Sequence, residues 1–154
     1  MLPKFHILFG ALFSTFLWLV YPEIDFYVII VFLSTFLIDI DHYLVYVIRK
    51  KSLNLKKAHD YFYSIHKNLK PMLDSGVKVK APLVFIHTVE FLILVFILAL
   101  FFPFFLYILS GMLFHSLLDV VDMIIVFGTI YPRSFSILHY FLNKKKNSKK
   151  IKFL

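Results

Sequence analysis

Long apolar runs constrain this chain more than any other feature of its sequence. A helix that crosses a bilayer needs about 20 mostly apolar residues, and four stretches qualify: residues 5–21, 26–48, 83–100 and 104–128. The chain is 60% hydrophobic over 154 residues, whereas soluble domains are about 45–50% apolar. A soluble domain of this size could not bury that much apolar surface. The sequence therefore predicts an all-α, polytopic membrane protein with four transmembrane helices.

The basic residues predict how these helices are oriented. Lys4 precedes the first run, nine Lys and Arg lie in residues 49–82, and seven follow residue 128. The short links at 22–25 and 101–103 contain none. Lys and Arg concentrate on the cytoplasmic side of inner membranes. We therefore expect a multi-pass protein of the cell (inner or plasma) membrane, with both termini and the loop 49–82 in the cytoplasm.

The loop 49–82 has the pattern of an amphipathic helix. Its apolar residues recur at helical spacing while lysines occupy other faces; the apolar positions are Leu55, Ala58, Phe62, Ile65 and Leu69. Two interpretations remain open. The helix lies on the membrane surface, or it packs on the protein itself.

The chain divides into a membrane domain, residues 1–143, and a basic cytoplasmic tail, residues 144–154. The tail is polar and highly charged, so we expect it to be disordered and attracted to anionic lipid headgroups. The net charge of +8 follows from this membrane topology. Membrane lipids are therefore the expected partners, and nucleic acid is not. The oligomeric state is left open.

Several kinds of chemistry are excluded by missing residues. The chain has no cysteine, which excludes disulfides, thiolate nucleophiles and cysteine-based zinc sites. It also lacks a G-x-S-x-G motif, a glycine-rich phosphate loop and an H-E-x-x-H motif.

The ionisable residues of the apolar runs gather at one depth. All lie in the cytoplasmic half of a run or near its middle, and the outer halves contain none. His6 opens the first run, and the others lie roughly 6–20 Å from the cytoplasmic end of their runs at 1.5 Å per residue. These ionisable residues are His6, Asp39, Asp41, His42, His87, Glu90, His115, Asp119 and Asp122. Three of the four runs thus present a histidine with a carboxylate at the same depth, and the first run adds a histidine.

The spacing of these residues places them on shared helix faces. Residues three, four or seven positions apart lie on one side of a helix, which groups Asp39 with His42, His87 with Glu90, and His115 with Asp119 and Asp122. Asp41 points about 200° away from Asp39 on a regular helix. It must therefore face a different neighbour or lie where the helix is distorted.

A bound metal ion would explain why these groups are tolerated. A charged side chain at the centre of a span costs about 2.5–3.5 kcal/mol on insertion scales. Imidazole with carboxylate suits Zn or Mn, and carboxylates suit Mg. The alternative is a set of His–Asp hydrogen bonds that only hold helices together. Because three such pairs lie at one depth, we favour metal or proton chemistry.

The order of the motifs is similar to that of a known family. The chain contains "FHILFGALFS" at 5–14, "IDIDH" at 38–42, "GMLFHSLLD" at 111–119 and "YPRSFSI" at 131–137. Together these resemble the membrane-bound metal-dependent hydrolases, small multi-span inner-membrane proteins of bacteria and archaea. Members typically show an early His, a P-D-x-D-H motif, an H-R-G-x-T-H segment and a late H-x-x-x-D. Here residue 38 is Ile, and "IHTVE" replaces the H-R-G-x-T-H segment.

The resemblance implies a metal site on the matching polar positions, which are His6, Asp39, Asp41, His42, His87, His115 and Asp119. We expect a divalent ion (Zn, Mn or Mg) with His6, Asp39, His87, His115 and Asp119 as ligands. Asp41, His42 and Glu90 are the candidate catalytic residues, as outer-sphere groups or general base. His59 and His66 cover the site from the loop or are simply interfacial.

The function predicted from these residues is metal-dependent hydrolysis of a lipid-borne ester or phosphoester from the cytoplasmic side. The depth of the ionisable groups favours a lipid-like over a soluble substrate. Two alternatives remain: a cation or proton transporter, which uses the same residue types in a relay, and a non-catalytic membrane protein whose polar cluster only fixes helix packing.

Overall fold

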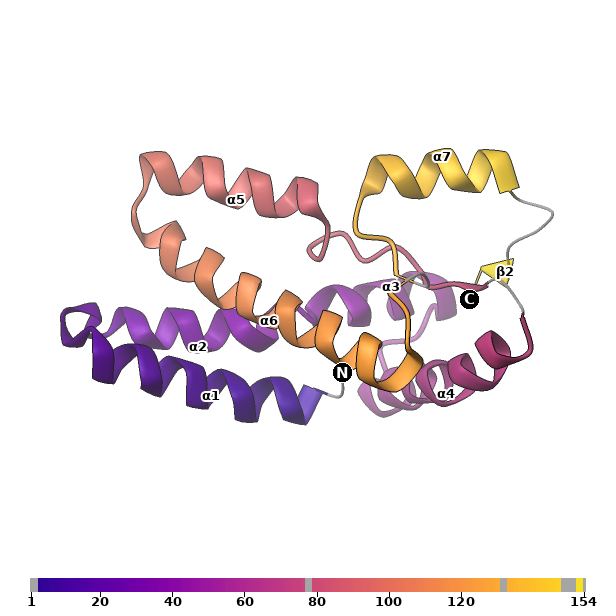
Figure 1. Ribbon diagram of the computed structural model, residues 1–154, viewed down its shortest axis with the longest axis horizontal. Helices are drawn as coiled ribbons and strands as arrows, with labels where there is room; N and C mark the ends of the chain where they lie inside the picture. Colours follow the sequence, from indigo (N-terminus) through magenta and orange to yellow (C-terminus); the bar gives the residue numbers. More distant parts are fainter. Residues whose placement is uncertain (1–2, 77–78, 131–132, 148–151, 154) are drawn as a thin grey trace. The chain divides into compact units, whose positions relative to one another are not determined.

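Helices account for nearly all of the regular structure in the computed structural model, which describes residues 3–76, 79–130, 133–147 and 152–153. Figure 1 shows the helices α1 (Pro3–Val20), α2 (Tyr27–Leu37), α3 (Ile40–Lys50), α4 (Leu55–Asp74), α5 (Val89–Phe101), α6 (Phe104–Phe127) and α7 (Ile137–Asn147). A single 3-10 turn, η1 (Pro22–Ile24), joins α1 to α2. The two-residue strands β1 (Val79–Lys80) and β2 (Lys152–Phe153) pair in parallel. The predicted all-α fold class is confirmed.

Three of these helical stretches are long and apolar enough to cross a membrane: Pro3–Val20, Tyr27–Lys50 and Phe104–Phe127. They indicate a membrane protein. Large apolar side chains such as Leu19 and Ile125 are more than two-thirds exposed, which suits contact with lipid better than contact with water. Helix α5 has 13 residues and is about 20 Å long, shorter than the roughly 30 Å hydrocarbon core. The predicted count of four spans is therefore not confirmed by helix length.

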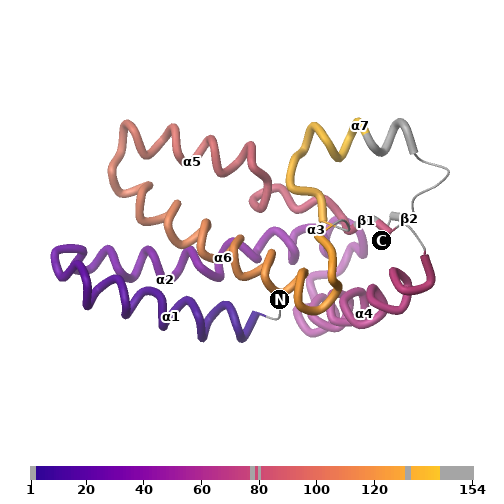
Figure 2. The backbone as a smooth tube through the Cα atoms, in the orientation of Figure 1, coloured from indigo at the N-terminus to yellow at the C-terminus, as the bar shows by residue number. Residues whose placement is uncertain are grey.

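The chain forms two compact units, which the tube in Figure 2 lets the reader follow by residue number. The first unit contains Met1–Asp39 and Val89–Val121, and so holds α1, η1, α2, α5 and most of α6. The second contains Ile40–Thr88 and Asp122–Leu154, and so holds α3, α4, the end of α6, α7 and both strands. The boundaries fall at Asp39 and Val121, beside predicted site residues.

Small residues bring the helices of the first unit close together. Gly10 of α1 faces the side chain of Thr35 on α2, where an added Cβ would meet the Thr35 hydroxyl. Gly111 of α6 faces α2 in the same way, and its Cβ would lie 2.5 Å from the Val31 carbonyl oxygen. Small residues at such contacts let helix backbones approach in membranes. Thr35 and Val31 of α2 therefore lie at its contacts with α1 and α6, respectively.

Stacked aromatic rings add to the packing of α6 in this unit. Phe13 of α1 stacks on Phe114 of α6 with ring centroids 4.1 Å apart, and Tyr27 of α2 stacks on Tyr107 of α6 at 4.6 Å. Aromatic pairs at such distances contribute about 0.5–1.5 kcal/mol each beyond the area they bury. Together with the glycine contacts, they set α1 and α2 against α6.

The second apolar run, residues 26–48, is interrupted in its middle. Helix α2 ends at Leu37 and α3 begins at Ile40. At the break, the Asp39 amide donates to the Phe36 carbonyl three residues earlier, at 3.1 Å, which is the tighter 3-10 pattern. The prediction of one continuous helix is wrong here. The alternative drawn from Asp41, that the helix is distorted, is confirmed.

The third run begins later than predicted, because residues 83–88 are not helical. Residues 85–88 instead form a turn in which the Thr88 hydroxyl donates to the Phe85 carbonyl at 2.8 Å. The Ile86 amide donates to Asp41 Oδ2 at 2.9 Å. That amide is engaged by a side chain, and α5 starts only at Val89.

The amphipathic helix of the loop is confirmed as α4. Its N-terminus is capped by Asn54, whose side-chain oxygen accepts from the Lys57 amide at 2.9 Å. Ala58 and Leu69, on the predicted apolar face, are buried, and the rings of Tyr46 on α3 and Tyr61 on α4 lie 5.6 Å apart. Packing on the protein therefore accounts for this part of the apolar face.

Part of the basic tail, residues 144–154, has regular structure. Helix α7 continues to Asn147, and Lys152–Phe153 pairs with β1. The expectation of disorder is therefore wrong for residues 144–147 and 152–153. Residues 148–151 and 154 lie outside the described part of the chain, as do residues 131–132 of the "YPRSFSI" segment.

The contact of Gly111 with α2 gives a test of this packing. Gly111→Ala should lower stability by about 1–3 kcal/mol, the usual cost of overpacking, although alanine favours a helix by about 1 kcal/mol. Thermal unfolding in detergent measures the effect. Ala11→Leu, which adds bulk at an exposed position of α1, is the control and should change little. A Gly111→Ala protein as stable as wild type would contradict the close approach.

Candidate metal centre

The predicted site residues divide between the two units. His6, Asp39, Glu90, His115 and Asp119 lie in the first unit. Asp41, His42 and His87 lie in the second. Each unit brings its own histidines and aspartates together, so each group is considered by itself.

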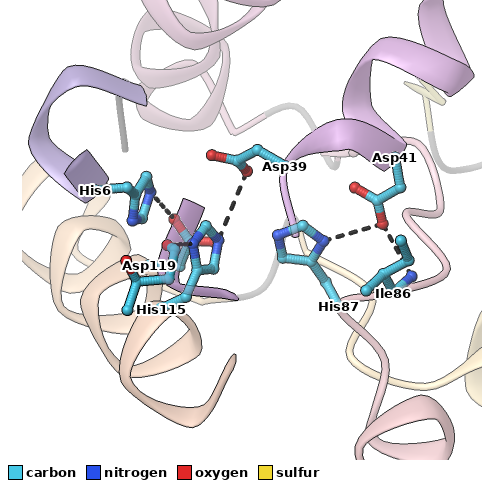
Figure 3. A network of polar contacts seen from close by, with 8 residues as sticks. His6, Asp39, Asp41, Ile86, His87, His115 and Asp119 are labelled. Atoms are coloured by element: carbon cyan, nitrogen blue, oxygen red, sulfur yellow. Dashed lines mark hydrogen bonds and ion pairs between the residues drawn. The ribbon is translucent and has the colours of Figure 1, made fainter. Parts of the chain in front are cut away.

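His115 is the centre of the group in the first unit, and Figure 3 shows both carboxylates directed toward it. Its Nε2 lies 3.2 Å from Asp119 Oδ2, one helical turn along α6, and 3.6 Å from Asp39 Oδ1 at the end of α2. His115 is fully buried and the Asp119 side chain is 5% exposed. The Asp39 side chain is 19% exposed, so this carboxylate is the most accessible member of the group.

The Thr35 carbonyl decides which nitrogen of His115 carries a proton. It lies 2.8 Å from Nδ1, and because a carbonyl oxygen only accepts, Nδ1 must donate. A regular helix would direct this carbonyl at the amide of residue 39, but the Asp39 amide donates to Phe36. The break in the second run therefore makes the Thr35 oxygen available to His115.

His115 consequently meets the two carboxylates with its other nitrogen. In a neutral ring with a proton on Nδ1, Nε2 carries the lone pair. That lone pair faces Asp39 and Asp119 at the distances given above, and like partial charges repel at such range. The arrangement is favourable only with a proton on Nε2 or with a cation between these atoms.

His6 distinguishes these two possibilities. Its ring stacks on that of His115, with centroids 3.9 Å apart and planes 19° from parallel. The ring is fully buried. Its Nε2 is 3.2 Å from Asp119 Oδ1, yet neither ring nitrogen makes a hydrogen bond of acceptable geometry within the described residues. A proton on His115 Nε2 would still leave both His6 nitrogens buried without a hydrogen bond, at a cost of about 1–3 kcal/mol for each buried polar group.

A divalent cation would satisfy the whole group. His6, Asp39 and His115 each offer a ligand atom, and these atoms lie within 4.8 Å of one another. Asp119 lies close to both imidazoles. The donor set of two imidazoles and two carboxylates suits Zn or Mn, and the carboxylates balance the charge of the ion. This buried His/Asp group could therefore hold a metal ion, and its residues fit one.

The group in the second unit is built around Asp41 and His87. Asp41 Oδ2 lies 3.0 Å from His87 Nδ1 and also accepts from the Ile86 amide. Asp41 and His87 are both buried. The His42 ring meets the His87 ring edge-on with centroids 5.0 Å apart, and it meets Phe62 of α4 at 5.1 Å.

The remaining candidates lie at less buried positions. Glu90 is in the first turn of α5, where a helix N-terminus favours a carboxylate. His66 Nε2 is 3.5 Å from Asp122 Oδ2, and the His66 ring packs against Phe127. His59 is exposed beside Asp60. The roles predicted for Glu90, His59 and His66 stay predictions.

Two backbone groups of the site were missed by sequence reasoning: the Thr35 carbonyl and the Ile86 amide. A side-chain pattern does not indicate where a carbonyl or an amide points. One signal was present: the opposed directions of Asp39 and Asp41 left a distorted helix as one of two alternatives, and a distorted helix frees backbone groups for other partners.

Comparisons with known proteins identify no relative: no protein-family model, no curated protein and no solved structure matches the chain. The resemblance to membrane-bound metal-dependent hydrolases therefore stays a prediction from the quoted motifs.

The stacking of His6 on His115 gives a test that needs no metal. His6→Phe keeps an aromatic ring at this position and removes both nitrogens, whereas His6→Ala removes the ring and leaves a cavity. We expect His6→Ala to be less stable than His6→Phe by about 1–3 kcal/mol. Thermal unfolding of the metal-free protein in detergent measures the difference. Equal stability of the two variants would contradict a packed ring at residue 6.

Proposed function

We propose that this chain is a membrane-embedded, metal-dependent hydrolase that acts on a lipid-borne ester or phosphoester. The observation that carries the proposal is the group around His115. Its Nδ1 is committed to a backbone carbonyl, while its Nε2 faces two carboxylates beside a second, fully buried imidazole without a hydrogen bond. Buried charges are tolerated when they are paired or coordinate a metal.

In this proposal His6, Asp39, His115 and Asp119 hold the divalent ion, with Zn or Mn best suited to the donors. When bound, such an ion supplies a Lewis acid that polarises the scissile bond and activates water. Asp39 is the most accessible of the four side chains. A carboxylate that does not hold the ion would accept the proton of the attacking water. Acid–base roles for Asp41, His42 and Glu90 remain part of the prediction.

The proposed substrate class follows from the surroundings of this group. The helices that carry its residues expose large apolar side chains, among them Phe5 and Leu8 near His6 and Leu117 near His115. A soluble polar substrate would meet a strongly apolar surface on approach, whereas a lipid can enter from the side. A lipid ester or phosphoester is therefore favoured.

Metal analysis of detergent-purified protein tests the proposed site. We expect about one Zn or Mn per chain after reconstitution, lost in His115→Ala because two carboxylates and His6 cannot replace the missing donor. His59→Ala is the matched control, since His59 is exposed outside the group, and it should retain the metal. Metal in neither protein, or equal metal in wild type and His115→Ala, would remove the proposal and leave a packing or proton-relay role.

Hydrolysis assays with the same proteins test the reaction and its substrate class. Wild type and His59→Ala with metal should release product from chromogenic lipid esters or phosphoesters in mixed micelles, and His115→Ala should not. Turnover of soluble short-chain esters alone would contradict a lipid-borne substrate. Metal uptake into proteoliposomes without hydrolysis would instead support a transporter.

We also propose that the chain crosses the cell membrane four times, with both termini in the cytoplasm. This is supported by the basic residues, which avoid the links at 22–25 and 101–103. The fourth crossing requires α5 together with the extended residues that precede it. A chain in which α5 does not cross would place the link at 101–103 on the cytoplasmic side.

Single-cysteine labelling distinguishes the two topologies, since the chain has no cysteine of its own. Glu23→Cys and Phe102→Cys should react with an impermeant maleimide from outside intact cells. Ser75→Cys, in the loop after α4, should react only in inverted vesicles. All three positions are exposed. Labelling of Phe102→Cys from the cytoplasmic side alone would exclude four crossings.

A further inference from the structure

The Asp41–His87 pair lies in the second unit and is separate from the group around His115. One carboxylate oxygen, Asp41 Oδ2, receives two contacts: the Ile86 amide at 2.9 Å and His87 Nδ1 at 3.0 Å. The His87 side chain is fully buried and that of Asp41 is 5% exposed. These contacts of the buried pair determine which nitrogen of the His87 ring carries the proton.

The tautomer of His87 follows from the partners of Asp41. A backbone amide only donates, and a carboxylate only accepts. His87 therefore donates its Nδ1 proton to the same oxygen that accepts from Ile86. In the neutral ring the lone pair is then on Nε2.

The local backbone holds this arrangement in place. His87 lies in the turn at residues 85–88, which the Thr88 hydroxyl closes by donating to the Phe85 carbonyl at 2.8 Å. The Ile86 amide orients the carboxylate, and the edge of the His42 ring limits rotation of the His87 ring from another side. The ring is thus fixed both in orientation and in protonation.

We infer that Asp41 is a positioning residue that holds His87 as the Nδ1–H tautomer, so that His87 offers Nε2 to a divalent cation. Histidines that bind metals almost always donate their other N–H to a carboxylate, a carbonyl or water, which sets the tautomer and raises the basicity of the ligand. The second Asp41 oxygen, Oδ1, is buried without a hydrogen bond in the described residues.

This inference rests on the proposed function in one respect: the cation is a divalent ion of the kind that the proposed hydrolase would use. It assigns Asp41 a different role from direct acid–base catalysis, because its Oδ2 is already engaged by two donors. It also makes a claim about the metal-free protein, which can be tested before any metal or substrate is identified.

Long-range proton–nitrogen NMR of histidine-labelled, metal-free protein in micelles tests the tautomer, with His87→Gln used to assign the His87 signals. We expect a protonated Nδ1 and an unprotonated Nε2 at His87. Asp41→Asn keeps an oxygen acceptor and should preserve this state, whereas Asp41→Ala should lose it. Asp60→Ala, on the exposed Asp60 of the same unit, is the control. A protonated Nε2 in wild type, or an unchanged ring in a folded Asp41→Ala protein, would overturn the inference.

Titration with Zn²⁺ tests the second half of the inference with the same signals. Zinc should move the His87 Nε2 resonance, and Asp41→Ala should weaken zinc binding by about 10–100-fold, as expected for loss of a carboxylate that orients a ligand. If Asp41→Ala does not fold, the wild-type titration decides. Zinc that moves the His6 and His115 signals but not His87 overturns this inference and leaves the proposed function intact. Zinc that moves no histidine signal overturns both.

Discussion

The hydrogen bond from His115 Nδ1 to the Thr35 carbonyl is the interaction on which the rest of the candidate site depends. It exists because the second apolar run breaks between Leu37 and Ile40, where the Asp39 amide turns back to Phe36. In a continuous helix the Thr35 carbonyl would be engaged within the helix. Because it is not, the buried His115 has a fixed tautomer, and its second nitrogen faces the carboxylates of Asp39 and Asp119.

The packing of the first unit makes that hydrogen bond reachable. Gly10 lets α1 approach Thr35, and Gly111 lets α6 approach α2 one turn before His115. A side chain larger than hydrogen at either glycine would push these helices apart. The small residues therefore do more than tighten the bundle: they bring His6, Thr35 and His115 within contact distance, which the stack of the two imidazoles requires.

In both units a hydrogen bond from Nδ1 sets the tautomer of a buried histidine, but the acceptor differs. In each, a buried histidine gives its Nδ1 proton to an acceptor outside its own helix or turn: a backbone carbonyl for His115 and a carboxylate for His87. In the neutral form, each ring then has its lone pair on Nε2. This repetition supports the proposal that these residues are ligands for a cation.

Much of the fold class could be predicted from the sequence, because the length of an apolar run, the periodicity of α4 and the placement of Lys and Arg are properties of the chain taken one segment at a time. The positions of the ionisable residues were also available, and the opposed directions of Asp39 and Asp41 left a distortion as one of two alternatives. The start of α5 and the helical part of the basic tail could not be predicted in this way. The turn that precedes α5 contains the Ile86 amide, which donates to the Asp41 carboxylate 45 residues earlier in the sequence. A high charge density does not indicate the helix that continues to Asn147.

The sequence by itself thus predicted a helical, membrane-type chain whose apolar runs contain histidines and aspartates at similar distances from one end, since hydrophobicity and charge act locally. The spacing already predicted that His115 and Asp119 share a helix face. Only the tertiary structure decided that His6 and Asp39 join them in one unit, and that Asp41 meets His87 in the other. The physical reason is that these partnerships pass through the Thr35 carbonyl and the Ile86 amide. The directions of those groups follow from where a helix breaks and what packs against it, not from the spacing of side chains.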